Sequence, residues 1–473
     1  MNTRQLVLPS GPTVLGSRRL YRLSKNDLLI NFTVDIAYLV PAELDVARLR
    51  NALAHTLTSF PLFCGKLVKE PEWAICLAPM PGAPLTIREG LPEGCDKSGD
   101  MEVVQLQPGP LIDRIDPFRL LSGEDPALAK VTVATGTNAT FLGVSCTHTL
   151  ADLHIVLKFL RTWSQLYIGM VIEPPPVYND NIQLTLPSDP QRCAYLKSKL
   201  PSLLTTTFPL DNFDHSLFFP YPVTRIDVHF TGAQVSALHE AVVRLAVGRN
   251  GSLTAIKAAM LTRQDALSAF FVTVANASYD TPVTRIHNVV NCRGFNPDVL
   301  PKDMVGNGLQ YAATPPVVIS PNIREMVLTY AVNIRVSLLE ARNPQYVKDV
   351  LAVSGEEWYQ PAQANRGHYV PPTPGEVIIN SNYRHDWPSA HFGHPGTVRW
   401  QHPDAVPTDN YILMFPSNPV QTHNGEWYTD EGACEVTLKV KKGREDLFMA
   451  ALKTVWIEVV GEELKTPRMD VYA

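Results

Sequence analysis

Apolar residues recur three or four positions apart in four stretches of the chain, residues 46–57, 156–167, 235–245 and 323–334. That spacing places the apolar side chains on one face of an α-helix, so each stretch predicts an amphipathic helix. The strongest stripe consists of Val156, Phe159, Leu160, Trp163 and Tyr167. We expect each helix to pack its apolar face against a core.

Strand-like stretches lie between the predicted helices. The segments 131–133 and 140–147 are rich in β-branched and apolar residues. Near the end of the chain, Val436, Leu438 and Val440 alternate with polar residues, which is typical of a strand with one exposed face. Both halves of the chain therefore combine strands with helices, and the sequence predicts a mixed α/β protein.

One stretch differs from the rest by its proline content. Its prolines are Pro174, Pro175, Pro176, Pro187, Pro190, Pro201, Pro209, Pro220 and Pro222. Proline fixes φ and lacks an amide hydrogen, so this stretch predicts neither a regular sheet nor a long helix. Because 473 residues exceed what one core usually serves, we interpret 173–222 as a crossover between an N-terminal domain, 1–172, and a C-terminal domain, 223–473. A functional loop within a single domain is the alternative.

Composition and charge exclude several classes of protein. A hydrophobic fraction of 45% supplies enough apolar surface for a large core, which excludes a disordered chain. The net charge is −5 and no basic cluster is present, so nucleic-acid binding is not expected. The sequence has neither an apolar leader nor an 18-residue apolar run, and its seven cysteines include no C-x-x-C pair. We therefore expect a soluble cytoplasmic protein with reduced thiols and no metal site.

The candidate for chemistry is the H-x-x-x-D segment from His148 to Asp152. The predicted strand 140–147 ends at His148, and the strongest helical stripe begins directly after Asp152. Neutral imidazole is suited to removing a proton from a hydroxyl or amine near neutral pH. The alternative is a structural one, in which His148 is a core histidine and Asp152 is a helix cap.

Other polar clusters indicate less. His385, His391 and His394 lie near Asp386, and we interpret them as parts of a solvated, proline-flanked loop rather than metal ligands. Gly306-Asn307-Gly308 is too short for a phosphate-binding loop. The chain has no G-x-S-x-G elbow, which disfavours a serine hydrolase, and we interpret Cys146 as a core residue.

Several segments in a fixed order support a resemblance to a known family. They are Leu23-Ser24 with Asp27, the stretch 59–67, His148 to Asp152, the stretch 265–269, Asn291-Cys292-Arg293-Gly294, Gly306-Asn307 and His391-Phe392-Gly393-His394-Pro395. In this order they resemble the BAHD acyl-CoA-dependent acyltransferases, and the fungal branch more than the plant branch. The likeness covers nearly the whole chain.

The resemblance implies a two-domain fold of the chloramphenicol-acetyltransferase type. Each domain would have a mixed sheet with flanking helices, and a channel would run through the interface. His148 would be the general base that activates an acceptor hydroxyl, or less readily an amine, for attack on the thioester of an acyl-CoA. Asp152 would turn away from the channel and pair with Arg293, which would hold the His148 loop in shape.

The resemblance also implies further site residues. Asn380 or Ser381 would donate a hydrogen bond to the oxyanion. Donor contacts would come from Thr262, Arg263, Gly306, Asn307 and Gly393. Acyl-CoA would be a co-substrate rather than a permanently bound cofactor. The acceptor would be a small, largely apolar secondary metabolite, with acetyl as the default acyl group, and we expect a monomer.

Three residues depart from the family pattern. Leu153 replaces the glycine that usually follows the aspartate, and His391 and His394 replace the Asp and Trp of D-F-G-W-G. These changes affect the expected loop geometry and donor binding. Two alternatives follow, a condensation-domain-like acyltransferase that uses a carrier-protein thioester and a catalytically inactive small-molecule-binding homologue. Thr147 before His148 and Leu153 after Asp152 differ from the H-H-x-x-x-D-G of condensation domains, which favours free CoA.

Overall fold

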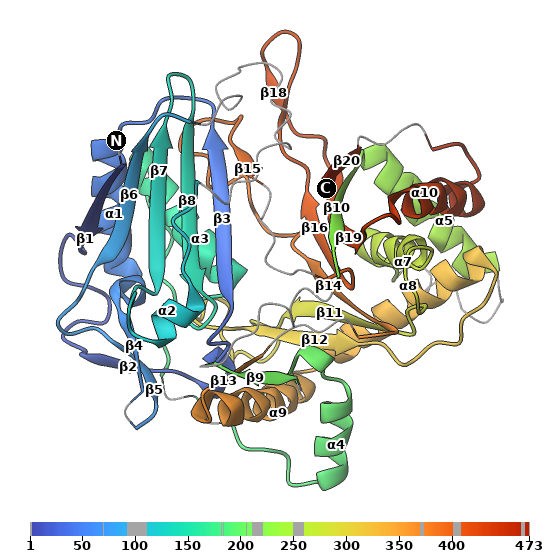
Figure 1. Ribbon diagram of the computed structural model, residues 1–473, viewed down its shortest axis with the longest axis horizontal. Coiled ribbons are helices and arrows are strands. Elements are labelled where there is room, and N and C mark those ends of the chain that lie inside the picture. Colours follow the sequence, from blue (N-terminus) through green and yellow to red (C-terminus); the bar gives the residue numbers. More distant parts are fainter. Residues whose placement is uncertain are drawn as a thin grey trace.

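The computed structural model describes most of the chain. The described residues are 2–69, 71–91, 111–180, 182, 184–204, 206–210, 221–248, 260–368, 373–400, 408–464 and 469–472. Two large sheets lie side by side, one built mainly from the first third of the sequence and the other from the second half (Figure 1). Of the described helices, none is both long and apolar enough to cross a membrane.

The N-terminal sheet has six strands in the order β1-β6-β7-β8-β3-β15. These are β1 (Asn2–Val7), β6 (Ala83–Glu89), β7 (Ala129–Thr135), β8 (Thr140–Thr147), β3 (Thr33–Val40) and β15 (Val398–Trp400). The helices α1 (Val46–Ser59) and α3 (Leu153–Ile168) pack against each other and share its core, and α2 (Pro117–Leu121) is a short helix. A separate three-stranded sheet contains β2 (Leu20–Arg22), β5 (Trp73–Cys76) and β4 (Lys66–Lys69).

The C-terminal sheet has seven strands in the order β12-β11-β14-β16-β19-β10-β20. Its strands are β12 (Leu309–Ala313), β11 (Arg285–Asn291), β14 (Glu376–Ser381), β16 (Tyr411–Pro416), β19 (Cys434–Lys441), β10 (Val223–Phe230) and β20 (Met469–Tyr472). Four helices cover one face, α5 (Gly232–Gly248), α7 (Arg263–Ala275), α8 (Ile323–Glu340) and α10 (Glu445–Val460). A second core forms between this face and the helices.

The periodicities in the sequence are confirmed as structure. The four helical stripes correspond to α1, α3, α5 and α8, and the predicted strand 140–147 is β8. The strand β19 buries Val436, Leu438 and Val440. The neighbouring charged residues Glu435 and Lys439 are only partly buried. The mixed α/β class follows from this arrangement.

The proline-rich segment connects the two sheets without joining either of them. Its described part contains only the short helix α4 (Pro190–Ser198), a 3-10 turn (Ser202–Leu204) and β9 (Thr207–Pro209). β9 pairs with β13 (Arg366–His368), and α4 packs on α9 (Pro344–Gln363), where Arg192 lies 3.0 Å from Asp349. The described residues of this segment thus form no long helix and no regular sheet, which agrees with the expected effect of proline.

One segment of the C-terminal half packs into the N-terminal half. β15 pairs antiparallel with β3, with Val398 opposite Leu39. Phe392 is buried against Trp163 of α3, with ring centroids 5.3 Å apart. A boundary at residue 223 does not divide the packing cleanly, because the segment Trp387–Trp400 completes the N-terminal core and sheet. A hairpin of β17 (Val420–Gln421) and β18 (Trp427–Tyr428) lies farther along the chain.

Candidate active site

A cavity of about 640 Å³ lies between the two halves. The N-terminal half contributes the start of β3, His148 and the first turn of α3. The C-terminal half contributes residues of β11, β12, β14 and β16, and the start of α7. Most of the lining surface is apolar, with a few polar side chains that point inward, as is usual for small-molecule sites.

His148 is held in one orientation by Asn307. β8 ends at Thr147, so the chain delivers His148 to the cavity between the halves. Its Nδ1 lies 2.6 Å from Oδ1 of Asn307, and the Nδ2 of Asn307 donates to the carbonyl oxygen of His148 at 2.7 Å. Because that second bond identifies the Asn307 oxygen as the one that faces the ring, Nδ1 must carry the proton. Nε2 is therefore bare and can accept a proton.

The imidazole of His148 is neutral near neutral pH. Burial lowers its pKa, and the nearby Asp152 carboxylate and the hydrogen bond to Asn307 oppose that shift only in part. A neutral ring with a bare nitrogen is the form that a general base needs. Asn307 is fixed in turn, because its backbone N–H donates to Oδ1 of Asp27 at 2.7 Å. Burial raises the pKa of Asp27 to about 6.

Asp152 and Arg293 form a buried ion pair behind the cavity. Nη1 of Arg293 lies 2.6 Å from Oδ2 of Asp152, and both side chains are almost fully buried. The same carboxylate oxygen accepts from the backbone N–H of Gly308 at 2.9 Å, and Oδ1 caps α3 through the N–H of Ile155 at 3.3 Å. Burial raises the pKa of Asp152, but Arg293 outweighs that effect and the pKa is lowered. The expected pairing is present, and Asp152 is also a helix cap.

The Gly-Asn-Gly segment 306–308 packs too closely for side chains at its two glycines. Gly306 has φ +95°, and a Cβ there would lie 2.4 Å from the Asp27 carboxylate. A Cβ at Gly308 would lie 2.5 Å from Arg293. The carbonyl of Gly306 accepts from Arg293 at 2.6 Å. The segment therefore presents Asn307 to His148 while it leaves room for the ion pair.

The other predicted site residues are divided between the cavity and its surroundings. Asn380 and Ser381, at the end of β14, line the cavity, and Nδ2 of Asn380 donates to the Tyr411 hydroxyl at 3.0 Å. Thr262 also lines it and caps α7. The remaining expected donor contacts, Arg263, Gly306, Asn307 and Gly393, are not among the lining residues. Gly393 follows the buried Phe392 and packs near Ile168 of α3.

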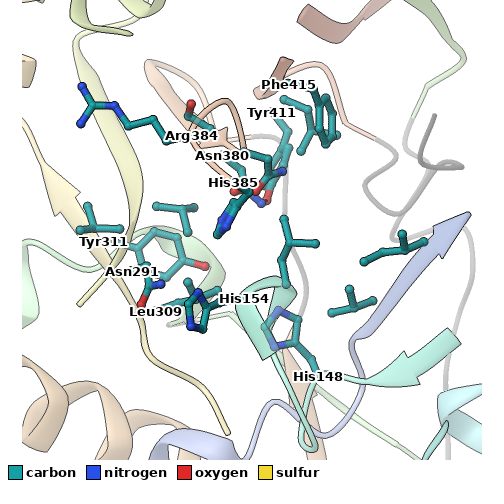
Figure 2. A pocket seen from close by; sticks show the side chains of 18 of the residues that line it. His148, His154, Asn291, Leu309, Tyr311, Asn380, Arg384, His385, Tyr411 and Phe415 are labelled. Carbon is teal, nitrogen blue, oxygen red and sulfur yellow. The ribbon is translucent and has the colours of Figure 1, made fainter. Parts of the chain in front are cut away.

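Two histidines of the cavity were not identified as site residues from the sequence. His385 lies in the expected loop, between the exposed residues Arg384 and Asp386, but its ring lines the cavity, and burial lowers its pKa to about 4. His154 lines the cavity from the first turn of α3, and its ring centroid lies 6.4 Å from that of His385. Figure 2 shows both rings in the same cavity as His148. No local pattern in the sequence marks His154 as a site residue, although it lies only six residues after His148.

Several arginines gather on the C-terminal side of the cavity. Arg335, Arg342 and Arg384 all line it. Arg335 pairs with the buried Asp265, whereas burial and the neighbouring charges of Arg335 and Arg384 lower the pKa of Arg342. This side therefore favours an anionic group. Among the described residues, no group of three or more His, Cys, Asp or Glu side chains is arranged to hold a metal ion.

Comparison with known proteins identifies the fold. No family model matches the chain, and no curated protein matches it in sequence. Among solved structures, vinorine synthase matches with a TM-score of 0.55 and 17% identity over 98% of this chain and 97% of that one. F. graminearum TRI101 complexed with coenzyme A and T-2 mycotoxin matches with a TM-score of 0.62 and 13% identity, over 92% of this chain and 97% of that one. The nonribosomal peptide synthetase FmoA3 matches with a TM-score of 0.58 and 15% identity, over 98% of this chain and 47% of that one.

These matches extend over nearly the whole chain and across both sheets. The expected two-domain fold of the chloramphenicol-acetyltransferase type is therefore confirmed. At identities of 13–17% the likeness establishes the fold alone. The chemistry has to be argued from the side chains at that cavity.

Proposed function

We propose that this protein transfers an acyl group, acetyl by default, from acyl-CoA to a hydroxyl of a small, largely apolar secondary metabolite. The observation that carries the proposal is the orientation of His148, whose Nδ1 bonds Asn307 at 2.6 Å and whose Nε2 is left bare beside a cavity of about 640 Å³. The similarity of fold to a protein that is complexed with coenzyme A and T-2 mycotoxin supports the same chemistry.

The reaction that suits this geometry needs no covalent enzyme intermediate. Nε2 of His148 removes the proton from the acceptor hydroxyl as its oxygen attacks the thioester carbon. The tetrahedral oxyanion then collapses, the C–S bond breaks, and the imidazolium returns the proton to the sulfur of CoA. Binding both reactants in one cavity makes their encounter intramolecular, which supplies much of the rate enhancement.

The oxyanion requires a hydrogen-bond donor on the opposite side of the thioester. Asn380 and Ser381 are the proposed donors because both line the cavity at the end of β14. Asn380 uses its amide nitrogen as a donor to Tyr411, and an amide nitrogen carries two hydrogens, so one is left for the substrate. A donor of this kind contributes about 2.7–4 kcal/mol to transition-state stabilisation.

The acyl-CoA is proposed to enter from the C-terminal side of the cavity, because the arginines at the β3 end, Arg114 and Arg399, are paired with Asp35 and Glu435. Arg342 and Arg384 line that side, and Thr262 stands at the N-terminus of α7 next to it. CoA carries several phosphate charges, and guanidinium groups are well suited to phosphate. The acceptor then occupies the end of the cavity near β3.

A carrier-protein thioester is the second candidate donor. The similarity of fold to a nonribosomal peptide synthetase favours it. Thr147, which stands where condensation domains have the first histidine of H-H-x-x-x-D-G, favours free CoA. The two donors differ in a measurable way, because only the first predicts tight binding of CoA in the absence of another protein.

Thermal melting with CoA, acetyl-CoA and longer acyl-CoAs tests the donor without knowledge of the acceptor. A ligand at 100 times its Kd stabilises the folded protein by about 2.7 kcal/mol, so we expect a rise in Tm of a few degrees that depends on the acyl chain. Absence of a shift with every CoA compound would contradict the proposal and favour the carrier-protein thioester or an inactive homologue.

Turnover tests the base. CoA release from acetyl-CoA with a panel of hydroxylated terpenoids and polyketides should fall about 100- to 10,000-fold in His148→Ala. The shift in Tm with CoA should persist in that variant. His423→Ala, at an exposed histidine of the C-terminal half, is the matched control and should keep wild-type turnover. Unchanged turnover in His148→Ala would disprove the role of His148.

A further inference from the structure

Two histidines that the proposed mechanism does not use face each other in the cavity. His154 comes from the first turn of α3, and His385 comes from the loop after β14. Their ring centroids lie 6.4 Å apart with an angle of 50° between the planes. In Figure 2, both rings and that of His148 project into one space from three different segments.

Neither ring forms a close hydrogen bond with another described residue, and both line the cavity. Nε2 of His154 is buried without a hydrogen-bond partner, and the nearest carboxylate oxygen, Oδ1 of Asp303, lies 3.6 Å away. The ring of His385 makes no hydrogen bond to any residue that the structure describes. A direct bond between ring nitrogens needs a separation of about 3 Å, and rings with centroids 6.4 Å apart do not reach it. A single oxygen atom can bridge two rings at this separation where one nitrogen of each ring faces it.

The charge state of the rings defines what that atom must be. Burial lowers the pKa of both His154 and His385, so both are neutral near neutral pH. A neutral imidazole has one N–H donor and one bare acceptor nitrogen. The Asp303 carboxylate beside Nε2 of His154 favours the tautomer that carries its proton there. Nδ1 of His154 is then a bare acceptor, and its partner must donate a hydrogen.

We propose that His154 and His385 together bind a second hydroxyl of the acceptor, so that the preferred acceptor is a diol. Its O–H donates to Nδ1 of His154, and its oxygen accepts from the N–H of His385. A carbonyl or ether oxygen at the same place cannot donate, and a plain hydrocarbon leaves both rings unsatisfied. The inference rests on the proposed function for the first hydroxyl, which reacts at His148, and it makes the other two imidazoles determinants of specificity.

Binding to the protein saturated with CoA tests this without turnover. The probes are 1-indanol, cis-1,2-indanediol, cis-1,3-indanediol and 2-methoxy-1-indanol, which share one rigid skeleton. Calorimetry or ligand-observed NMR gives each Kd. We expect at least one diol to bind about tenfold more tightly than 1-indanol, since one satisfied pair of hydrogen bonds is worth about that factor. The methyl ether keeps the oxygen but not the proton, and it should bind no better than 1-indanol.

The matched variants are His154→Phe and His385→Phe, with His423→Phe at an exposed position as the control. Either of the first two should remove the advantage of the diol over 1-indanol while the Kd of CoA stays the same. His154→Gln, which keeps a hydrogen-bonding group, should retain part of that advantage. The inference would be overturned if neither diol binds the wild type better than 1-indanol, and failure of all four probes to bind has the same meaning. It would also be overturned if the advantage of the diol survives in both Phe variants.

Failure of the inference is distinguishable from failure of the proposed function. The proposed function depends on binding of CoA and on loss of turnover in His148→Ala. The diol test compares four alcohols and ethers with one another and can be repeated without CoA. A protein that binds CoA but shows no preference for diols would keep its proposed activity and lose only the role assigned to His154 and His385.

Discussion

At the scale of single residues, the decisive feature is a side-chain amide that selects the tautomer of the base. The side-chain nitrogen of Asn307 donates to the carbonyl oxygen of His148. The side-chain oxygen of Asn307 therefore faces the ring and accepts a hydrogen bond from Nδ1 of His148. A serine or alanine at position 307 would leave the ring free to place its proton on either nitrogen. The same contact holds the ring against rotation, so orientation and protonation state have one cause.

Removal of this amide should reduce catalysis without unfolding the protein. In Asn307→Ala we expect kcat to fall about 10- to 100-fold, with a much smaller change in KM, because the lost hydrogen bond orients the base. The pH profile of kcat/KM separates orientation from general damage. The lowered pKa of His148 places the acid limb of the wild type below pH 6.5, and the limb should move lower still in the variant, because the bond to Asn307 raises that pKa.

The control for this prediction is Asn296→Ala, which removes an amide that bonds Pro344 outside the cavity. It should leave kcat and the pH profile unchanged. An acid limb that does not move in Asn307→Ala would show that Asn307 does not influence the base.

Residues of the site differed in how far the sequence could reveal them. His148 and Asp152 lie in one short motif between a strand and a helix, so local pattern was sufficient to single them out. The partner of Asp152 is 141 positions away, and only the resemblance to a family indicated Arg293. His385 could not be identified, because its place in the cavity depends on how the loop after β14 packs against α3.

At the scale of elements, α3 begins with a residue that has two structural tasks. Asp152 caps the helix through Ile155 and neutralises Arg293, which also donates to the carbonyl of Met304 at 2.8 Å. The helix is thereby connected to the loops of the C-terminal half that carry Asn307. Any shift of the start of α3 would be transmitted to His148, four residues earlier.

Asp152→Ala should therefore destabilise the protein strongly. Loss of one partner leaves Arg293 buried and unpaired, which costs about 3–5 kcal/mol of the free energy of unfolding. Asp189→Ala is the matched control, since Asp189 caps the exposed helix α4 and forms no ion pair with any residue that the structure describes, so its loss should cost about 1 kcal/mol. Denaturant unfolding of both variants measures the difference. An Asp152→Ala protein that unfolds like the wild type but lacks turnover would contradict a structural role for Asp152.

Helices and strands were predicted well where burial is one-sided. The stripe of α1 and the alternation of β19 each reflect one face turned to a core, so spacing alone identified them. The helix α3 is covered on all sides, and its large apolar side chains still recur at helical spacing. The segment 391–395 was located only by resemblance, because its structural role depends on one side chain. Phe392 adopts φ +51° and is buried against Trp163, and nothing local in the sequence indicates that contact.

At the scale of the whole molecule, the two halves line a cavity between them, and one segment of the C-terminal half packs into the N-terminal half. Proline content predicted a crossover at 173–222, and chain length predicted two cores. The described residues form four hydrophobic clusters, of which the two largest belong to the two large sheets. The contribution of β15 to the N-terminal sheet was not predictable, because a three-residue strand has too little pattern and its partner β3 lies more than 350 residues earlier. The division at residue 223 remains a description of the sequence rather than of the packing.

The buried histidines should make the stability of the whole protein sensitive to acid. The pKa of His385 is about 4 in the folded protein and near 6.5 in an unfolded chain, so the unfolded state binds more protons between these values. Its contribution to stability is present above pH 6.5 and is lost as the pH falls toward 4. At pH 5 the loss is about 2 kcal/mol relative to pH 7.

Comparison with His385→Phe isolates this contribution from those of other groups. Between pH 7 and pH 5 the free energy of unfolding should fall by about 2 kcal/mol less in the variant than in the wild type. Asp27, whose pKa is raised to about 6, changes stability in the opposite direction over part of the same range, and it does so in both proteins. Parallel curves for the two proteins would show that His385 titrates normally.

The pairing of β15 with β3 has a consequence for synthesis on the ribosome. The first five strands of the N-terminal sheet are complete at residue 147, whereas the sixth, β15, begins at residue 398. About 250 further residues are therefore translated before the sixth strand is available, roughly ten to fifty seconds at cellular rates. During that interval the outer edge of β3 has hydrogen-bonding groups without their final partner, and such an edge invites pairing with other nascent chains. Yield in a heterologous host should therefore depend on translation speed and chaperone supply more than the stability of the finished protein would suggest.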